Sequence, residues 1–218
     1  APVTQVNRAA GGFAIVLAGG ETVTADALLL ATGGGERRAY AWAQRLGHTI
    51  QPLAPSLFTF TVPDARLHGL AGVSVSEVEL RLTQSKLAQT GPLLITHWGL
   101  SGPAVLRLSA WGARVLHDQQ YQASLQINWL PAWRLPALED HLRALKAAQA
   151  RRTPGSQALF DLPLRLWQRL LAAAGSGDGQ RWGDLSKAQM QRLLTELTAG
   201  LYTIAGKGPF KEEFVTCG

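Results

Sequence analysis

The chain has 218 residues, of which 46% are hydrophobic and 17% charged, so it can bury a sizeable core and is not dominated by disorder. Lys and Arg outnumber Asp and Glu by 21 to 15, and the resulting charge of +6 permits a phosphate-rich partner without proving one. No apolar run approaches the roughly 18 residues of a membrane span, so we expect no membrane partner. The single cysteine, Cys217, excludes an internal disulfide and favours a cytoplasmic location.

Residues 1–35 are rich in predicted strands. Residues 13–17 form a short strand, and a turn then leads to residues 27–31 (ALLLA), a continuous apolar run typical of a strand covered on both faces of its sheet. This run ends in a glycine-rich turn. Residues 36–47 have helical composition, and Gly47 is placed to end that helix.

The next region, residues 52–130, predicts antiparallel strands. Residues 57–62 and 73–82 alternate apolar and polar side chains, residues 121–129 do so more loosely, and residues 91–96 form a further strand. We therefore expect a small β-barrel or sandwich. Within it, residues 104–117 predict a helix with Ser101 as the N-cap.

The pattern becomes helical over residues 131–200. Leucines at spacings of three and four predict helices over residues 135–150, 162–174 and 185–199, which together form a three-helix bundle. Residues 201–205 and 213–216 return to strand character. Because position 1 is not Met, the chain opens within an apparent strand and it stops just after the apolar pair at residues 214–215, we expect it to be an internal piece of a longer protein.

The first candidate site is the turn at Thr32, Gly33 and Gly34. Glycines at the end of a sheet strand let the backbone approach a ligand closely, and exposed amides there bind phosphate or ribose oxygens. A plain structural turn is the alternative.

The second candidate is the segment of residues 96–103, which joins a strand to a helix N-terminus. Its free amides suit an anion or an electron-rich ring, and His97 is able to move a proton near neutral pH. The alternative is that Ser101 only caps the helix and His97 only forms local hydrogen bonds. The histidines and the cysteine show no metal-ligand spacing, so we expect no metal site.

Taken in order, these pieces resemble the bacterial aminoacetone-oxidase-like flavoproteins, a family of NAD(P)/FAD-dependent oxidoreductases. The likeness covers nearly the whole chain, and the Thr-His-Trp-Gly-Leu-Ser-Gly-Pro run of residues 96–103 is its most specific part. The other carriers are the segments at residues 3–6, 31–34, 46–50, 55–57, 70–73 and 214–218. Family members continue the Ala-Thr-Gly-Gly turn with a serine, a proline and a second glycine-rich turn, whereas here residues 35–38 lead straight into the predicted helix.

The resemblance implies an α+β protein in which a split FAD-binding domain carries an insert of a small antiparallel β-barrel and a three-helix bundle. The implied boundaries are residues 1–51 for part of the FAD-binding domain, 52–130 for the barrel, 131–200 for the helices and 201–218 for the return to the FAD-binding domain. The implied FAD-binding residues are Val3, Thr32, Gly33, Gly34, Thr216, Cys217 and Gly218. The implied substrate-side residues are His97, Gly99, Ser101 and Gly102, with His97 as the candidate catalytic residue.

We therefore expect the central portion of an FAD-dependent oxidoreductase, with NADH or NADPH as reductant and an unknown small molecule as substrate. The alternative is an RNA-binding module, or a flavoprotein acting on a base in structured RNA. Between residues 135 and 170 six cations outnumber three carboxylates, and they would dock on phosphate unless they form an ordinary solvated surface. These cations are Arg143, Lys146, Arg151, Arg152, Arg165 and Arg169.

Overall fold

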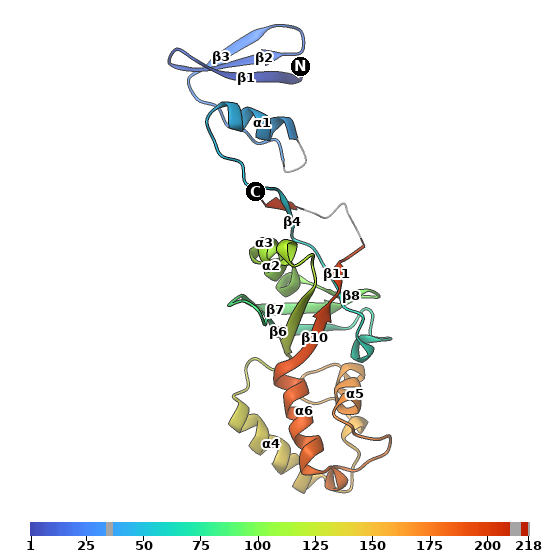
Figure 1. Ribbon diagram of the computed structural model, residues 1–218. Helices are drawn as coiled ribbons and strands as arrows, with labels where there is room; N and C mark the ends of the chain where they lie inside the picture. The colour runs from blue at the N-terminus through green and yellow to red at the C-terminus, as the bar shows by residue number, and fades with distance from the viewer. Residues whose placement is uncertain (34–36, 210–214, 218) are drawn as a thin grey trace. The chain divides into compact units, whose positions relative to one another are not determined.

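The computed structural model describes residues 1–33, 37–209 and 215–217 (Figure 1). The chain divides into two compact units. The N-terminal unit comprises Ala1–Ala54 with Val215–Gly218, and the barrel–bundle unit comprises Pro55–Phe214. The short strands β4 (Ala54–Ser56) and β12 (Val215–Cys217) pair with each other, so the chain enters and leaves the barrel–bundle unit at neighbouring strands.

The N-terminal unit contains a three-stranded antiparallel sheet and one helix. The strands are β1 (Val3–Ala9), β2 (Gly12–Leu17) and β3 (Thr22–Ala25), and the helix is α1 (Arg37–Arg45). Val6 of β1 is buried with Ala39 and Trp42 of α1. Gly47 follows the helix at a φ of 99°, so the predicted strand at residues 13–17 and the predicted helix stop are both confirmed.

The predicted strand at residues 27–31 is wrong. This segment has no regular structure, and Leu29 is 87% exposed. A fully apolar strand requires neighbouring strands that satisfy its N–H and C=O groups and cover its faces. No strand pairs with this segment among the residues that the structure describes.

The barrel–bundle unit is built on a seven-stranded antiparallel sheet in the order β10-β9-β6-β7-β8-β5-β11. Its strands are β5 (Phe60–Thr61), β6 (Ser74–Leu82), β7 (Ala88–Ile95), β8 (Gly99–Ser101), β9 (Ala123–Asn128), β10 (Gly200–Ile204) and β11 (Gly206–Lys207). The strands at the two ends of this order are separated in sequence only by Ala205, whose N–H donates to the carbonyl oxygen of Thr61 at 2.9 Å. One continuous segment therefore closes the sheet into a barrel, as the sequence predicts.

The position of β10 and β11 moves one expected boundary. We expected the FAD-binding domain to resume at residue 201, but Leu201 pairs with Gln126 and Lys207 pairs with Phe60 within the barrel. Alternating residues of this segment, Tyr202 and Ile204, are buried in the barrel core. The period-two pattern of residues 200–204 predicts a strand but carries no information about which sheet receives it.

A helix covers the barrel sheet after β8. Helix α2 (Pro103–Trp111) ends at Gly112, and the short helix α3 (Ala113–Asp118) follows it. The predicted Ser101 cap is wrong, because Ser101 ends β8 and the N-cap residue is Gly102 at a φ of 99°. That backbone conformation favours glycine, and a serine at this position would be strained.

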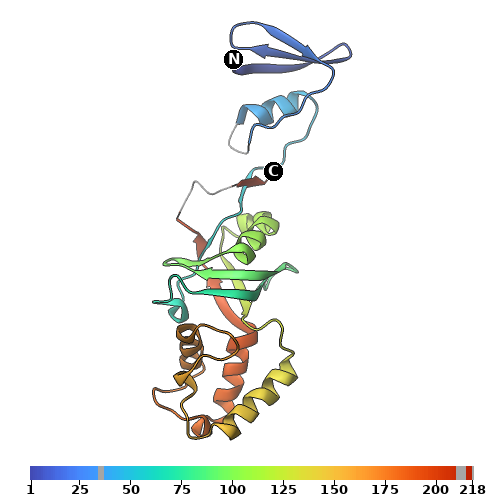
Figure 2. The same cartoon turned by 180° about the vertical axis from the view of Figure 1, so that it is seen from behind.

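Three helices form the bundle, as predicted: α4 (Leu135–Ala148), α5 (Leu164–Ala173) and α6 (Lys187–Ala199). They gather at one end of the barrel in both views (Figure 1, Figure 2). Ser186 caps α6 in a reciprocal capping box with Gln189, and α6 runs directly into β10. Buried side chains of the barrel and of the bundle form one continuous hydrophobic core. No helix within the described ranges is long and apolar enough to cross a membrane.

Candidate functional site

The glycine turn of the N-terminal unit is open to solvent. Thr32 and Gly33 are exposed, and Gly33 has a φ of 75°. Among the described residues, a Cβ built on Gly33 would meet no atom within 4 Å. An open turn with a positive φ fits the close approach of a phosphate or ribose oxygen to exposed amides.

The other residues implied in FAD binding lie in separate elements of the same unit. Val3 begins β1 and is half-buried, and Thr216 lies in β12 and is also half-buried. Gly34, Gly218 and the side chain of Cys217 lie outside the described residues. Their part in a cofactor site therefore stays a prediction.

The second candidate site begins at a tight turn between β7 and β8. The N–H of Thr96 donates to the carbonyl oxygen of Gly99 at 2.8 Å, and the N–H of Gly99 donates to Oγ1 of Thr96 at 3.1 Å. The two bonds close the turn and leave the His97 side chain exposed at its tip. Neither ring nitrogen of His97 forms a hydrogen bond with another residue in the described part of the chain.

The glycines of residues 96–103 have a structural reason. A Cβ on Gly99, which has a φ of 151°, would lie 2.3 Å from the carbonyl oxygen of Phe60. A Cβ on Gly102 would lie 3.0 Å from the backbone nitrogen of Leu94. The backbones pass too closely there for any side chain, so the most specific motif of the sequence owes its glycines to barrel packing.

Trp98 fixes the other side of the turn. Its indole Nε1 donates to Oγ1 of Thr59 at 3.2 Å, and its carbonyl oxygen accepts from the N–H of Val62 at 2.9 Å. Gly208 passes so close that a Cβ there would lie 1.9 Å from the same Thr59 oxygen. The turn is thereby held between β5 and the segment after β11.

A cavity of about 540 Å³ lies beside this turn. It is lined by Thr61, Val62, Pro63, Leu67, His68, Gly69, Ala71, Thr96, His97, Trp98 and Gly99. We call it the His97 cavity. Of the predicted substrate-side residues, His97 and Gly99 line it, whereas Ser101 and Gly102 do not. Sequence reasoning missed the wall from residues 61 to 71, where only His68 offered a chemical signal.

An ion-pair network holds that missed wall. Arg66 contacts Asp64 at 2.7 Å and Glu196 of α6 at 2.6 Å, and its guanidinium lies 3.6 Å from the centroid of the Tyr202 ring. Hydrogen bonds from Arg66 hold the pKa of Asp64 below its usual value. Burial raises the pKa of Tyr202. The network ties the segment before His68 to α6 and β10.

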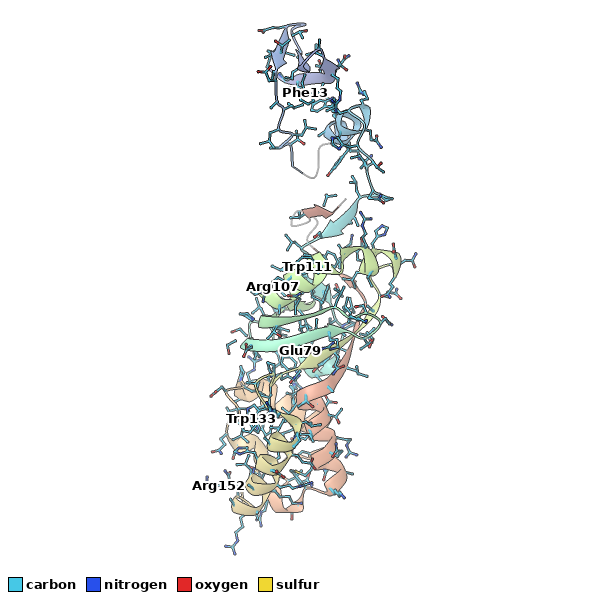
Figure 3. The ribbon with its side chains drawn as sticks, turned by 90° about the vertical axis from the view of Figure 1, so that its left-hand side faces the viewer. Phe13, Glu79, Arg107, Trp111, Trp133 and Arg152 are labelled. Carbon is cyan, nitrogen blue, oxygen red and sulfur yellow. The ribbon has the colours of Figure 1, made fainter. Side chains whose placement is uncertain are left out.

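The six bundle cations divide into two groups. Three make contacts within the protein: Arg143 with Glu139 and Asp140, Lys146 with the carbonyl oxygen of Leu185, and Arg165 with the carbonyl oxygen of Gly69. The other three side chains are exposed and have no hydrogen bond or ion pair among the described residues: Arg151, Arg152 and Arg169. Arg152 lies at the end of the bundle away from the barrel (Figure 3). Within the described part of the chain, no group of three or more possible metal ligands occurs.

Comparison with known proteins places this architecture. Residues 54–215 match the family described as HI0933-like protein barrel and H2TH domain. The chain is 28% identical to a 3-dehydro-bile acid delta(4,6)-reductase of Clostridium scindens over 99% of its own length and 54% of that protein. It is 29% identical to a ribosomal RNA dihydrouridine synthase of Escherichia coli over 99% of its own length and 53% of that protein. The chain thus spans about half the length of these curated relatives.

Proposed function

The chain belongs to the HI0933-like protein family, whose barrel and H2TH domain covers residues 54–215, and we propose from that premise that it works as part of an FAD-dependent oxidoreductase. Two relatives match 99% of the chain, and the name of each describes a reduction. This observation carries the proposal. One is a reductase, and the other forms a uridine that carries two additional hydrogen atoms. The finer likeness to aminoacetone-oxidase-like flavoproteins belongs to the same proposal.

FAD supplies a hydride when it is bound, with NADH or NADPH as its reductant. We assign its contacts in this chain to Thr32 and Gly33, because that turn is exposed and no atom of the described residues lies within 4 Å of a Cβ built on Gly33. A β-branched side chain at Gly33 would fill that space and strain the backbone at a φ of 75°. Val3, Gly34, Thr216, Cys217 and Gly218 complete the proposed set.

We assign substrate binding to the His97 cavity. Reduction of a double bond adds a hydride to one carbon and a proton to the other, so the site requires a proton donor as well as the cofactor. His97 is exposed at the tip of a turn whose backbone is fixed by two hydrogen bonds, and its imidazole is the group that we assign as the proton donor. Trp98 forms part of the cavity wall.

RNA is the second candidate substrate. The name of the Escherichia coli relative favours it, and so does the presence of exposed arginine side chains that form no hydrogen bond or ion pair among the described residues. Under this proposal the enzyme reduces a base within a structured RNA. The name of the Clostridium scindens relative favours a small molecule instead.

The test is the visible absorbance spectrum of the protein expressed from the complete gene, before and after anaerobic addition of NADH or NADPH. We expect flavin bands that bleach when one of the two nucleotides is added. A colourless protein that does not take up added FAD would contradict the proposal. Flavin bands that neither nucleotide bleaches would retain the cofactor assignment and reject the reductant.

A further inference from the structure

A second cavity of about 300 Å³ adjoins the His97 cavity. It is lined by Gly69, Leu70, Arg165, Gln168, Arg169, Ala172 and Asp178. Gly69 belongs to the lining of both cavities. We call this second space the arginine cavity. The two cavities therefore share one lining residue within the barrel–bundle unit.

The arginine cavity suits one singly charged anion. Arg165 donates to the carbonyl oxygen of Gly69, which fixes its guanidinium at the boundary between the cavities. Arg169 has no hydrogen bond or ion pair among the described residues, and its Nη2 would lie 3.8 Å from a Cβ built on Gly69. Asp178 is the one carboxylate in the lining, so two arginines and one aspartate give a formal charge of +1. This charge balances one phosphodiester.

The His97 cavity suits a planar ring with polar edges. Its lining contains the Trp98 ring and two imidazoles, His68 and His97, and it contains no carboxylate. Thr61 and Thr96 also belong to the lining, and their hydroxyls bond to the Lys207 carbonyl oxygen and to the Gly99 N–H within the protein. Aromatic and imidazole rings stack on bases, and hydroxyl and imidazole groups can bond to base edges. The fused-ring body of a steroid offers no hydrogen-bonding groups to the two imidazoles.

We propose that the two cavities bind one nucleotide of a single-stranded RNA segment, with the base in the His97 cavity and its phosphodiester beside Arg169. This proposal deepens the substrate side of the proposed function. Under this proposal the phosphate contact lies at one place, beside Arg169 and Gly69. It is not spread over the arginines of the whole bundle. Arg169 is the only one of the exposed, uncontacted bundle arginines that lies in this cavity.

The phosphate half is tested by fluorescence anisotropy with fluorescein-labelled hexauridylate. We expect Arg169→Gln to weaken binding about tenfold, the loss of roughly one charge-assisted hydrogen bond. It should also reduce the salt slope by about 0.7, the value for one phosphate contact on a single strand. The matched control is Arg181→Gln, because Arg181 is an exposed arginine outside the lining of the arginine cavity. The next residue, Trp182, is hydrogen-bonded to Arg152, which lies at the end of the bundle away from the barrel (Figure 3). This control should change the affinity by less than about twofold.

The base half is tested with His97→Ala on two probes. Hexauridylate affinity should fall about fivefold, whereas affinity for an abasic hexamer of equal charge should not change, because stacking requires a base. Thermal unfolding of every variant shows whether the unit is still folded. The proposal would be overturned if Arg181→Gln and Arg169→Gln reduced the hexauridylate affinity equally. It would also be overturned if His97→Ala reduced the affinity for both probes equally.

Two further outcomes also overturn it. One is the absence of hexauridylate binding up to about 1 mM at low salt. The other is displacement of the labelled probe by a carboxylated steroid with no displacement by unlabelled hexauridylate, which would assign the cavities to an anionic steroid. These measurements require no flavin and no turnover. Failure of RNA binding in a protein that retains flavin bands therefore rejects this inference alone, and RNA binding by a colourless protein rejects only the cofactor assignment.

Discussion

The two units of the chain differ in how completely they bury their apolar residues. The barrel–bundle unit has a continuous core that extends from Phe58 in the barrel to Leu197 in α6. The N-terminal unit buries Val6 against α1 and leaves Leu29 87% exposed in a segment that pairs with no strand among the described residues. An apolar run of residues therefore does not by itself produce a closed core. A core forms only where neighbouring strands or helices cover the run.

The largest effect should follow from removing the strands that close the barrel. We expect residues 52–209 alone to unfold cooperatively and residues 52–199 alone to lack a cooperative transition, because the shorter piece loses β10, β11 and the buried Tyr202. Circular dichroism during thermal unfolding measures both. A cooperative transition in the shorter piece would show that the barrel does not need closure.

A smaller effect is expected at a glycine in the barrel wall. Gly99→Ala should destabilise the protein by about 3 kcal/mol or more, because its Cβ would lie 2.3 Å from the carbonyl oxygen of Phe60. The control Gly206→Ala lies in the same sheet, where a Cβ would meet nothing within 4 Å, and should change stability by less than about 0.5 kcal/mol. Urea unfolding measures the difference, and equal effects of the two substitutions would refute the packing explanation.

The smallest effect is expected at the ion-pair network. Arg66→Gln should cost about 1 to 3 kcal/mol at neutral pH, because it removes charge-assisted hydrogen bonds to Asp64 and Glu196. Since the folded-state pKa of Asp64 is lowered, its contribution is present above its unfolded pKa and is lost as the pH falls through the folded value. The stability difference between wild type and variant should therefore shrink below about pH 4. A difference that stays constant down to pH 2 would exclude Asp64 as the partner that matters.

Local patterns predicted much of the barrel–bundle unit. Leucine spacing identified α4, α5 and α6, and strand alternation identified β6 and β9, because both periods report which face is buried. The same reasoning failed at residues 27–31, where the deciding factor is a partner strand. It also misplaced the boundary at residue 201, because the sheet that receives β10 depends on contacts with residues 123–127.

The candidate sites were predictable only in part. The turn at Thr96 and His97 was evident from its glycines and its histidine, although the structure explains the glycines by close backbone packing. The opposite wall with His68, and the arginine cavity beyond Gly69, were not predictable, because α5 reaches this loop from about a hundred residues away in sequence. Residue type indicated which of these side chains can bind a ligand or move a proton. Only the fold shows which of them lie close together.

The central claim is that the open glycine turn of the N-terminal unit serves a flavin while the barrel–bundle unit folds independently of it. The most direct measurement is the ratio of bound flavin to protein for wild type and Gly33→Val, each expressed from the complete gene. We predict about one FAD per chain for wild type and its loss in Gly33→Val, with unchanged thermal unfolding of the barrel–bundle unit. A colourless wild type, or a Gly33→Val protein with full flavin content, would contradict the account.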